Sequence, residues 1–138
     1  MGGKLASDRF GFEFSYDTET SQSAGRRFVQ RLALRIEDKD TPSTSEAAGA
    51  QLAAMAAWEK SGGEPYADLN KITQSVLVTN GKHDIMIPTV NSFTLSAHLP
   101  NAQLIIYPDS GHEALFQHAG AYTSHVSEFL ERSDALVV

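Results

Sequence analysis

Two polar loops in the second half of the chain carry the side chains best suited to chemistry. One loop follows Thr79 and contains Asp84, and the other follows Tyr107 and contains His112, 28 residues after Asp84. A carboxylate that accepts the Nδ1 proton of an imidazole fixes the tautomer of the ring and stabilises the imidazolium formed during catalysis. The opposite nitrogen, Nε2, is then oriented outward as a general base. We therefore predict that Asp84 and His112 form an acid–base pair.

The segments around these loops predict two neighbouring parallel strands. Residues 75–79 and 103–107 are short continuous apolar runs, which are typical of strands buried on both faces. A helix is expected at residues 89–99 between them and another at 121–132 after the second strand. In such a unit the loops beyond the carboxyl ends of the strands lie at one edge of the sheet. Neighbouring strands lie about 4.8 Å apart, so the two loops can meet.

The apolar spacing of these two helices predicts the face that each one buries. In the helix at 89–99 we expect Val90, Phe93 and Ala97 to face the sheet. In the last helix the residues expected to face inward are Tyr122, His125, Val126, Phe129 and Leu130.

The first half of the chain predicts two amphipathic helices joined by a loop that contains Pro42. The apolar positions of the helix at 24–38 are Phe28, Val29, Leu32 and Ile36. Its candidate N-cap residues are Thr20, Ser21 and Ser23. The second helix follows a capping box formed by Ser43 and Glu46, and it runs through Leu52, Met55 and Trp58. Together the two helices predict a helical hairpin.

These segments divide the chain into three parts. Residues 1–19 form an N-terminal segment, in which alternating aromatic residues predict a short strand at 10–16. Residues 20–70 form the helical hairpin, and residues 71–138 form an α/β core.

Residues 76–130 resemble the C-terminal portion of an α/β-hydrolase. The resemblance is carried by VLVTNGKHDIMIP at 76–88, LPNA at 99–102 and LIIYPDSGH at 104–112. It implies a partial α/β-hydrolase fold in which Asp84 is the acid after the penultimate strand and His112 is the histidine after the last strand. The hairpin resembles the cap that such enzymes insert before this segment. The implied activity is hydrolysis of an ester or a related acyl or C–X bond in a small-molecule substrate.

One departure from the family concerns the nucleophile. The family carries a serine in a Gly-x-Ser-x-Gly motif between a strand and a helix, and this motif does not occur in the 138 residues. The nearest imitation centres on Ser23, which we reject as a nucleophile because this stretch fits a helix start better. We therefore expect that the nucleophile half is missing and that this chain alone is inactive. The alternative is a non-catalytic truncated homologue that acts as a binding module or self-associates through an open sheet edge.

Three further features of the sequence bear on the candidate site. Glu113 stands where a small residue usually follows the histidine, and it could perturb His112 or face water. Asp109 could replace Asp84 as the orienting acid, but it is better placed to brace its own turn. His118 and His125 lie a heptad apart, yet no HExxH spacing occurs, so we expect neither a metal nor another cofactor. His125 is expected to be a half-buried residue of the last helix.

Composition and net charge exclude several classes of binding partner and of chemistry. The chain has 138 residues, 41% of them hydrophobic, and a formal net charge of −6, which argues against binding to nucleic acid. It contains no cysteine, which excludes thiol nucleophiles and disulfides. No apolar run is long enough to cross a bilayer, and the first residues lack the apolar core of a signal peptide. These features predict a soluble, cytoplasmic protein that does not bind membranes.

Overall fold

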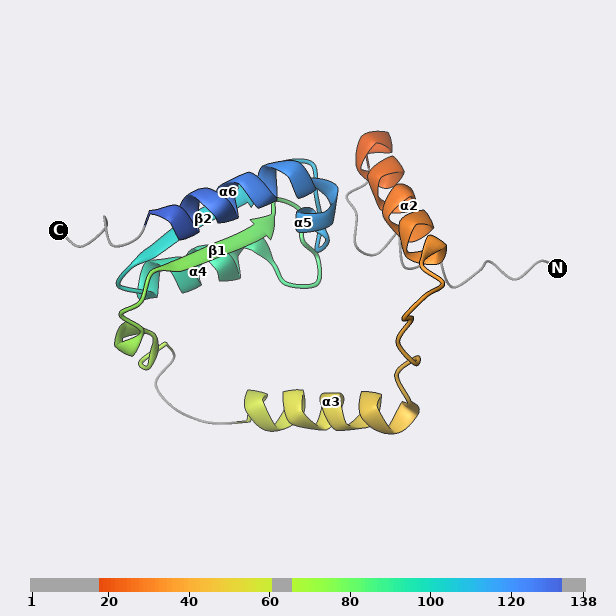
Figure 1. Ribbon diagram of the computed structural model, residues 1–138. Coiled ribbons are helices and arrows are strands. Elements are labelled where there is room, and N and C mark those ends of the chain that lie inside the picture. The colour runs from red at the N-terminus through yellow and green to blue at the C-terminus, as the bar shows by residue number, and fades with distance from the viewer. Residues whose placement is uncertain (1–17, 61–65, 133–138) are drawn as a thin grey trace.

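The computed structural model describes residues 18–60 and 66–132, and Figure 1 shows their arrangement. Strands β1 (Val76–Gly81) and β2 (Ala102–Tyr107) form a parallel pair in which Val76 lies opposite Ala102 and Gly81 lies opposite Tyr107. Both strands occur where the apolar runs predicted them. The strand expected at 10–16 lies outside the described residues.

Strand β1 continues two residues beyond the predicted end at Thr79. Asn80 and Gly81, which the sequence suggested as the boundary of the strand, pair with Ile106 and Tyr107. The parallel ladder therefore extends to the base of both polar loops.

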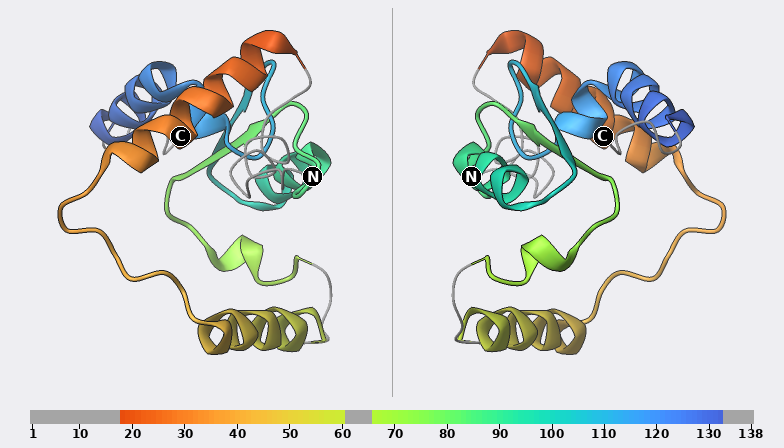
Figure 2. Two further views of the ribbon diagram at one scale, coloured as in Figure 1. Left: turned by 90° about the vertical axis from the view of Figure 1, so that its right-hand side faces the viewer. Right: turned by 90° about the vertical axis from the view of Figure 1, so that its left-hand side faces the viewer.

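The two strands lie between helices on opposite faces. Helix α4 (Thr89–His98) connects β1 to β2, and α6 (Ala119–Glu131) follows β2 after the short helix α5 (Ala114–Gln117). Figures 1 and 2 show α4 and α6 on opposite sides of the sheet. The buried apolar residues among the described ones are Val78, Leu99, Tyr107 and Ala114.

The prediction of which residues of α4 face the sheet is wrong. The side chains of Val90 and Phe93 are 63% and 64% exposed, and Ala97 is exposed as well. Ser92 is the buried residue of this helix, and its Oγ accepts a hydrogen bond from Asn80 of β1. A polar side chain at the end of the strand therefore selects the face of α4 that contacts the sheet.

The predicted inward face of α6 is largely present. Tyr122, His125, Val126 and Phe129 are half-buried, whereas Leu130 is 69% exposed and was predicted wrongly. Leu130 lies in the last turn of α6.

Helix α2 (Glu19–Leu34) begins earlier than predicted. Its N-cap is Thr18, whose Oγ1 accepts a hydrogen bond from the backbone N–H of Ser21 at 3.1 Å. The three candidate N-caps at positions 20, 21 and 23 are therefore wrong, since all of them lie within the helix. The helix also ends before Ile36, which is 84% exposed.

Helix α3 (Ser45–Glu59) occurs where a second helix was predicted, with a different cap. Thr44 is its N-cap, and the hydroxyl of Thr44 accepts a hydrogen bond from the N–H of Ala47 at 3.1 Å. The capping box of Ser43 and Glu46 is thus displaced by one residue, which removes Glu46 from the third helical position that the box requires.

The two helices do not pack side by side as the hairpin prediction expected. Figures 1 and 2 show α3 apart from α2 and from the sheet, and every residue of α3 is exposed. Helix α2 instead packs against α5, where Phe28 stacks on Phe116 with ring centroids 4.3 Å apart. Among the described residues, no helix combines the length and apolar character needed to cross a membrane.

Candidate active site

The site forms where β1 and β2 end side by side. Beyond the strands, the backbone N–H of Lys82 donates to the carbonyl of Tyr107 at 2.8 Å, and the N–H of His83 donates to the carbonyl of Ser110 at 2.9 Å. These hydrogen bonds join the loop that carries Asp84 to the loop that carries His112. The loops are therefore held together by backbone as well as by side chains.

Gly81 allows this close approach. A Cβ at this position would lie 2.1 Å from the carbonyl oxygen of Gly111 and 2.6 Å from that of Ser110. Both contacts are with backbone, so neither can be relieved by a rotamer change. A glycine is required here because the loop after β2 crosses directly over the end of β1.

The carboxylate of Asp84 is almost completely buried, with its side chain 1% exposed. Its Oδ1 accepts hydrogen bonds from the backbone N–H groups of Met86 at 2.8 Å and Ile87 at 2.9 Å. These two donors compensate the burial of a charged group and fix its orientation. The second oxygen, Oδ2, faces His112.

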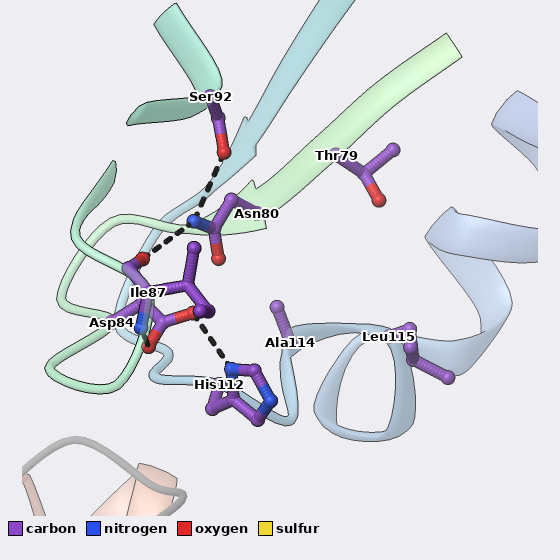
Figure 3. A pocket seen from close by; sticks show the side chains of 8 residues that line it. All are labelled: Thr79, Asn80, Asp84, Ile87, Ser92, His112, Ala114 and Leu115. Carbon is purple, nitrogen blue, oxygen red and sulfur yellow. Dashed lines mark hydrogen bonds and ion pairs between the residues drawn. The ribbon is translucent and has the colours of Figure 1, made fainter. Parts of the chain in front are cut away.

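The imidazole of His112 meets this carboxylate as the sequence predicted. Its Nδ1 lies 2.9 Å from Oδ2 of Asp84, and its side chain is 37% exposed. Figure 3 shows the second ring nitrogen directed away from Asp84. With Asp84 ionised, Nδ1 carries the proton and donates it, which leaves Nε2 unprotonated in the neutral ring.

A pocket of about 180 Å³ adjoins the pair. Its lining combines the end of β1, the two loops and the starts of α4 and α5, and Figure 3 shows its residues: Thr79, Asn80, Asp84, Ile87, Ser92, His112, Ala114 and Leu115. The pair thus lies on a small concave surface of mixed polarity.

The serine weighed as a nucleophile, Ser23, lies inside α2. Its Oγ accepts a hydrogen bond from the guanidinium of Arg27 at 2.8 Å, one helical turn further along. Ser21 is 1% exposed, and its Oγ accepts a hydrogen bond from Gln117 at 2.7 Å. Both hydroxyls lie within α2, and neither belongs to a Gly-x-Ser-x-Gly turn between a strand and a helix.

Asp109, the alternative orienting acid, binds elsewhere. Its Oδ1 accepts a hydrogen bond from the hydroxyl of Thr18 at 2.6 Å, and its backbone has a positive φ of 47°. Asp109 therefore links the N-cap of α2 to the turn before His112, and it is Asp84 that contacts the imidazole.

Glu113 is buried, which excludes the expectation that it faces water. It is 6% exposed, and its Oε2 has no hydrogen-bond partner among the described residues. Burial raises the pKa of Glu113 above its ordinary value of 4.5, and the neighbouring His112 opposes that increase. Its carboxyl group is consequently easier to protonate than an exposed one.

His118 and His125 both contact Tyr107. His118 stacks on the ring of Tyr107 and its Nε2 lies 2.9 Å from the carbonyl of Pro108, while Nδ1 of His125 lies 3.0 Å from the hydroxyl of Tyr107. Burial, together with the neighbouring Tyr122, raises the pKa of Tyr107. Within residues 18–60 and 66–132, no three His, Asp or Glu side chains converge as metal ligands.

Sequence reasoning missed Asn80 as part of the site. The sequence pattern placed Asn80 only at the start of the loop after Thr79, yet it is 9% exposed and lines the pocket. The available signal was a polar residue placed directly after an apolar strand and directly before a glycine.

Comparison with known proteins identifies similar chains. The family described as TAP-like protein matches residues 41–135. An alpha/beta hydrolase fold protein from Chitinophaga pinensis is 34% identical, with a TM-score of 0.84 over 94% of this chain and 46% of that one.

Curated relatives match shorter stretches. A 2-hydroxymuconate semialdehyde hydrolase from Pseudomonas putida is 36% identical over 69 residues, which cover 50% of this chain and 25% of the relative. A pimeloyl-[acyl-carrier protein] methyl ester esterase from Nitrosomonas europaea is 31% identical over 70 residues, which cover 51% of this chain and 25% of the relative. The matched stretches span about a quarter of the length of these curated relatives.

Proposed function

The chain belongs to the α/β-hydrolase superfamily through its TAP-like family, and from this premise we propose that Asp84 and His112 are the acid and base of a serine-hydrolase site. The observation that carries the proposal is the 2.9 Å contact between Nδ1 of His112 and the buried Oδ2 of Asp84. The proposed reaction is hydrolysis of an ester or a related acyl or C–X bond.

In the proposed mechanism, Nε2 of His112 removes the proton of a serine hydroxyl as the oxygen attacks the substrate. The proton then passes from Nε2 to the leaving group, and a water molecule regenerates the serine by the same route. Asp84 remains ionised throughout and stabilises the imidazolium. Its two backbone donors support this role because they fix the carboxylate before the reaction begins.

We further propose that the serine is supplied from outside these 138 residues and that the chain alone does not turn over substrate. Two observations support this: no Gly-x-Ser-x-Gly motif occurs in the sequence, and Ser23 lies within α2. The chain also corresponds to only 46% of the similar Chitinophaga pinensis protein.

The proposed substrate is a small molecule, and the proposal specifies only the type of bond that is hydrolysed. The relatives are named for different substrates, including a semialdehyde and a methyl ester. A further relative, from Lactobacillus delbrueckii, is named proline iminopeptidase. This variety supports a shared hydrolytic site and does not favour one substrate.

A chimera tests the proposed roles. The whole chain replaces the 46% of the Chitinophaga pinensis protein that it matches, and hydrolysis of p-nitrophenyl acetate is measured. We expect His112→Ala and Asp84→Asn each to lower kcat/KM by roughly 10³–10⁴-fold, because both remove the oriented base. His118→Ala is the matched control and should retain activity. Full activity in either of the first two variants would refute the proposal.

A second candidate is a non-catalytic module that self-associates through an open sheet edge. It is favoured by the two-stranded sheet, in which β1 and β2 pair only with each other among the described residues. Sedimentation equilibrium of the purified chain tests it. A concentration-dependent dimer combined with an inactive chimera would favour this candidate over the hydrolase.

A further inference from the structure

Asn80 uses both ends of its side-chain amide at the end of β1. Its Oδ1 accepts a hydrogen bond from the backbone N–H of Gly81 at 2.7 Å. Its Nδ2 donates to the carbonyl of Ile87 at 3.0 Å and to Oγ of Ser92 at 3.1 Å, as Figure 3 shows. The strand, the loop after it and helix α4 therefore meet at one buried amide.

The contact with Ile87 connects Asn80 to the candidate acid. The carbonyl of Ile87 accepts from Asn80, and the N–H of the same residue donates to Oδ1 of Asp84 at 2.9 Å. Met86 supplies the second donor to this oxygen at 2.8 Å. Because Oδ1 is occupied by these two donors, Oδ2 is the oxygen left to face Nδ1 of His112.

We propose that Asn80 is a positioning residue for the Asp84–His112 pair. It holds Ile87 in place, so that the turn from Asp84 to Ile87 presents Oδ2 to the imidazole. This role rests on the proposed function, since it requires that Asp84 and His112 act as the acid–base pair.

A different side chain anchors the start of the loop. The hydroxyl of Thr89 lies 2.7 Å from the carbonyl of Gly81 and 3.1 Å from that of Lys82. Loss of the Asn80 amide should therefore release the end of the loop, where Ile87 lies, while its beginning stays attached to α4. Because the two ends of the loop are anchored by different side chains, a loss of positioning at Ile87 can be distinguished from a loss of the fold.

The test follows the ring protons of His112 by NMR in the full chain labelled with ¹⁵N-histidine. A proton held between Nδ1 and Asp84 exchanges slowly with water and marks the Nδ1–H tautomer. Asn80→Leu has a similar volume without hydrogen bonds, and we expect it to accelerate this exchange at least about tenfold. Ser92→Ala retains the bond from Asn80 to Ile87, and exchange should stay within about twofold of the wild type.

The variant Asp84→Asn distinguishes failure of the proposed acid–base pair from failure of the positioning role of Asn80. If it leaves the Nδ1–H signal intact, the proposed acid–base pair fails and the role of Asn80 fails with it. If Asp84→Asn abolishes the signal while Asn80→Leu leaves its exchange rate unchanged, the pair stands and the positioning role is overturned. Should Asn80→Leu not fold, Asn80→Ser is measured instead, because its side chain is too short to reach both Ile87 and Ser92.

Discussion

At the scale of single residues, the candidate site depends on the hydrogen bonds that the buried carboxylate of Asp84 accepts. A buried charge is costly unless hydrogen bonds replace the water it loses. Oδ1 of Asp84 receives two backbone N–H groups and Oδ2 receives the imidazole of His112. Each oxygen therefore has a fixed role: Oδ1 binds the backbone of its own turn, and Oδ2 faces the imidazole.

Glu113 gives a prediction about pH, because burial raises its pKa above 4.5. A carboxyl group with a raised pKa binds its proton more tightly in the folded state, so stability falls as the pH rises from the ordinary pKa through the folded one. We expect Glu113→Gln to gain stability relative to the wild type as the pH rises above 4.5, as measured by urea unfolding. Glu131→Gln on the exposed side of α6 is the control. Parallel pH profiles for the wild type and Glu113→Gln would contradict this prediction.

Gly81 gives a steric prediction. Gly81→Ala places a Cβ 2.1 Å from a backbone oxygen, so the crossing loop must move, and we expect a loss of roughly 1–3 kcal/mol in unfolding free energy. Gly120→Ala is the matched control, because its Cβ meets nothing within 4 Å in α6 and the change should be neutral or stabilising. Denaturant titration compares the two, and equal stability for both variants would argue against the close approach.

At the scale of elements, α2 supports the loop that carries the histidine. Phe28 of α2 stacks on Phe116 of α5, and Thr18 at the start of α2 donates to Asp109 in the turn before His112. Together with the hydrogen bond from Gln117 to Ser21, these contacts join helix α2 to the elements around the site.

This arrangement predicts a local effect for Phe28→Ala. Loss of the half-buried stack should cost about 1–2 kcal/mol and accelerate hydrogen exchange in α2, while the amides of β1 and β2 are little affected. Leu32→Ala is the control, since Leu32 is 54% exposed in the same helix. Unchanged exchange in α2 after Phe28→Ala would show that the stack does not hold the helix.

The elements of the α/β unit could be predicted from sequence because their signals are strong. The apolar runs of β1 and β2 and the spacing between them predicted the parallel order and the meeting of Asp84 with His112. The face of α4 could not be predicted from periodicity, because a hydrogen bond between Asn80 and Ser92 decides it. Residues 43–45 offer three adjacent hydroxyls, so their composition did not identify Thr44 as the cap.

At the scale of the whole molecule, several large apolar side chains of the described residues are exposed. Exposed apolar side chains include Trp58 of α3, Ile85 beside the site and Phe93 of α4. This exposed apolar surface supports our proposal that the serine is supplied from outside these 138 residues.

The most direct test of the central claim is labelling by a fluorophosphonate, which reacts with an activated serine. We expect the 138-residue chain to remain unlabelled. The chimera with the Chitinophaga pinensis protein should be labelled on a serine outside this chain, and His112→Ala should abolish that label. Labelling of Ser23 in the chain alone, lost on His112→Ala, would contradict the account.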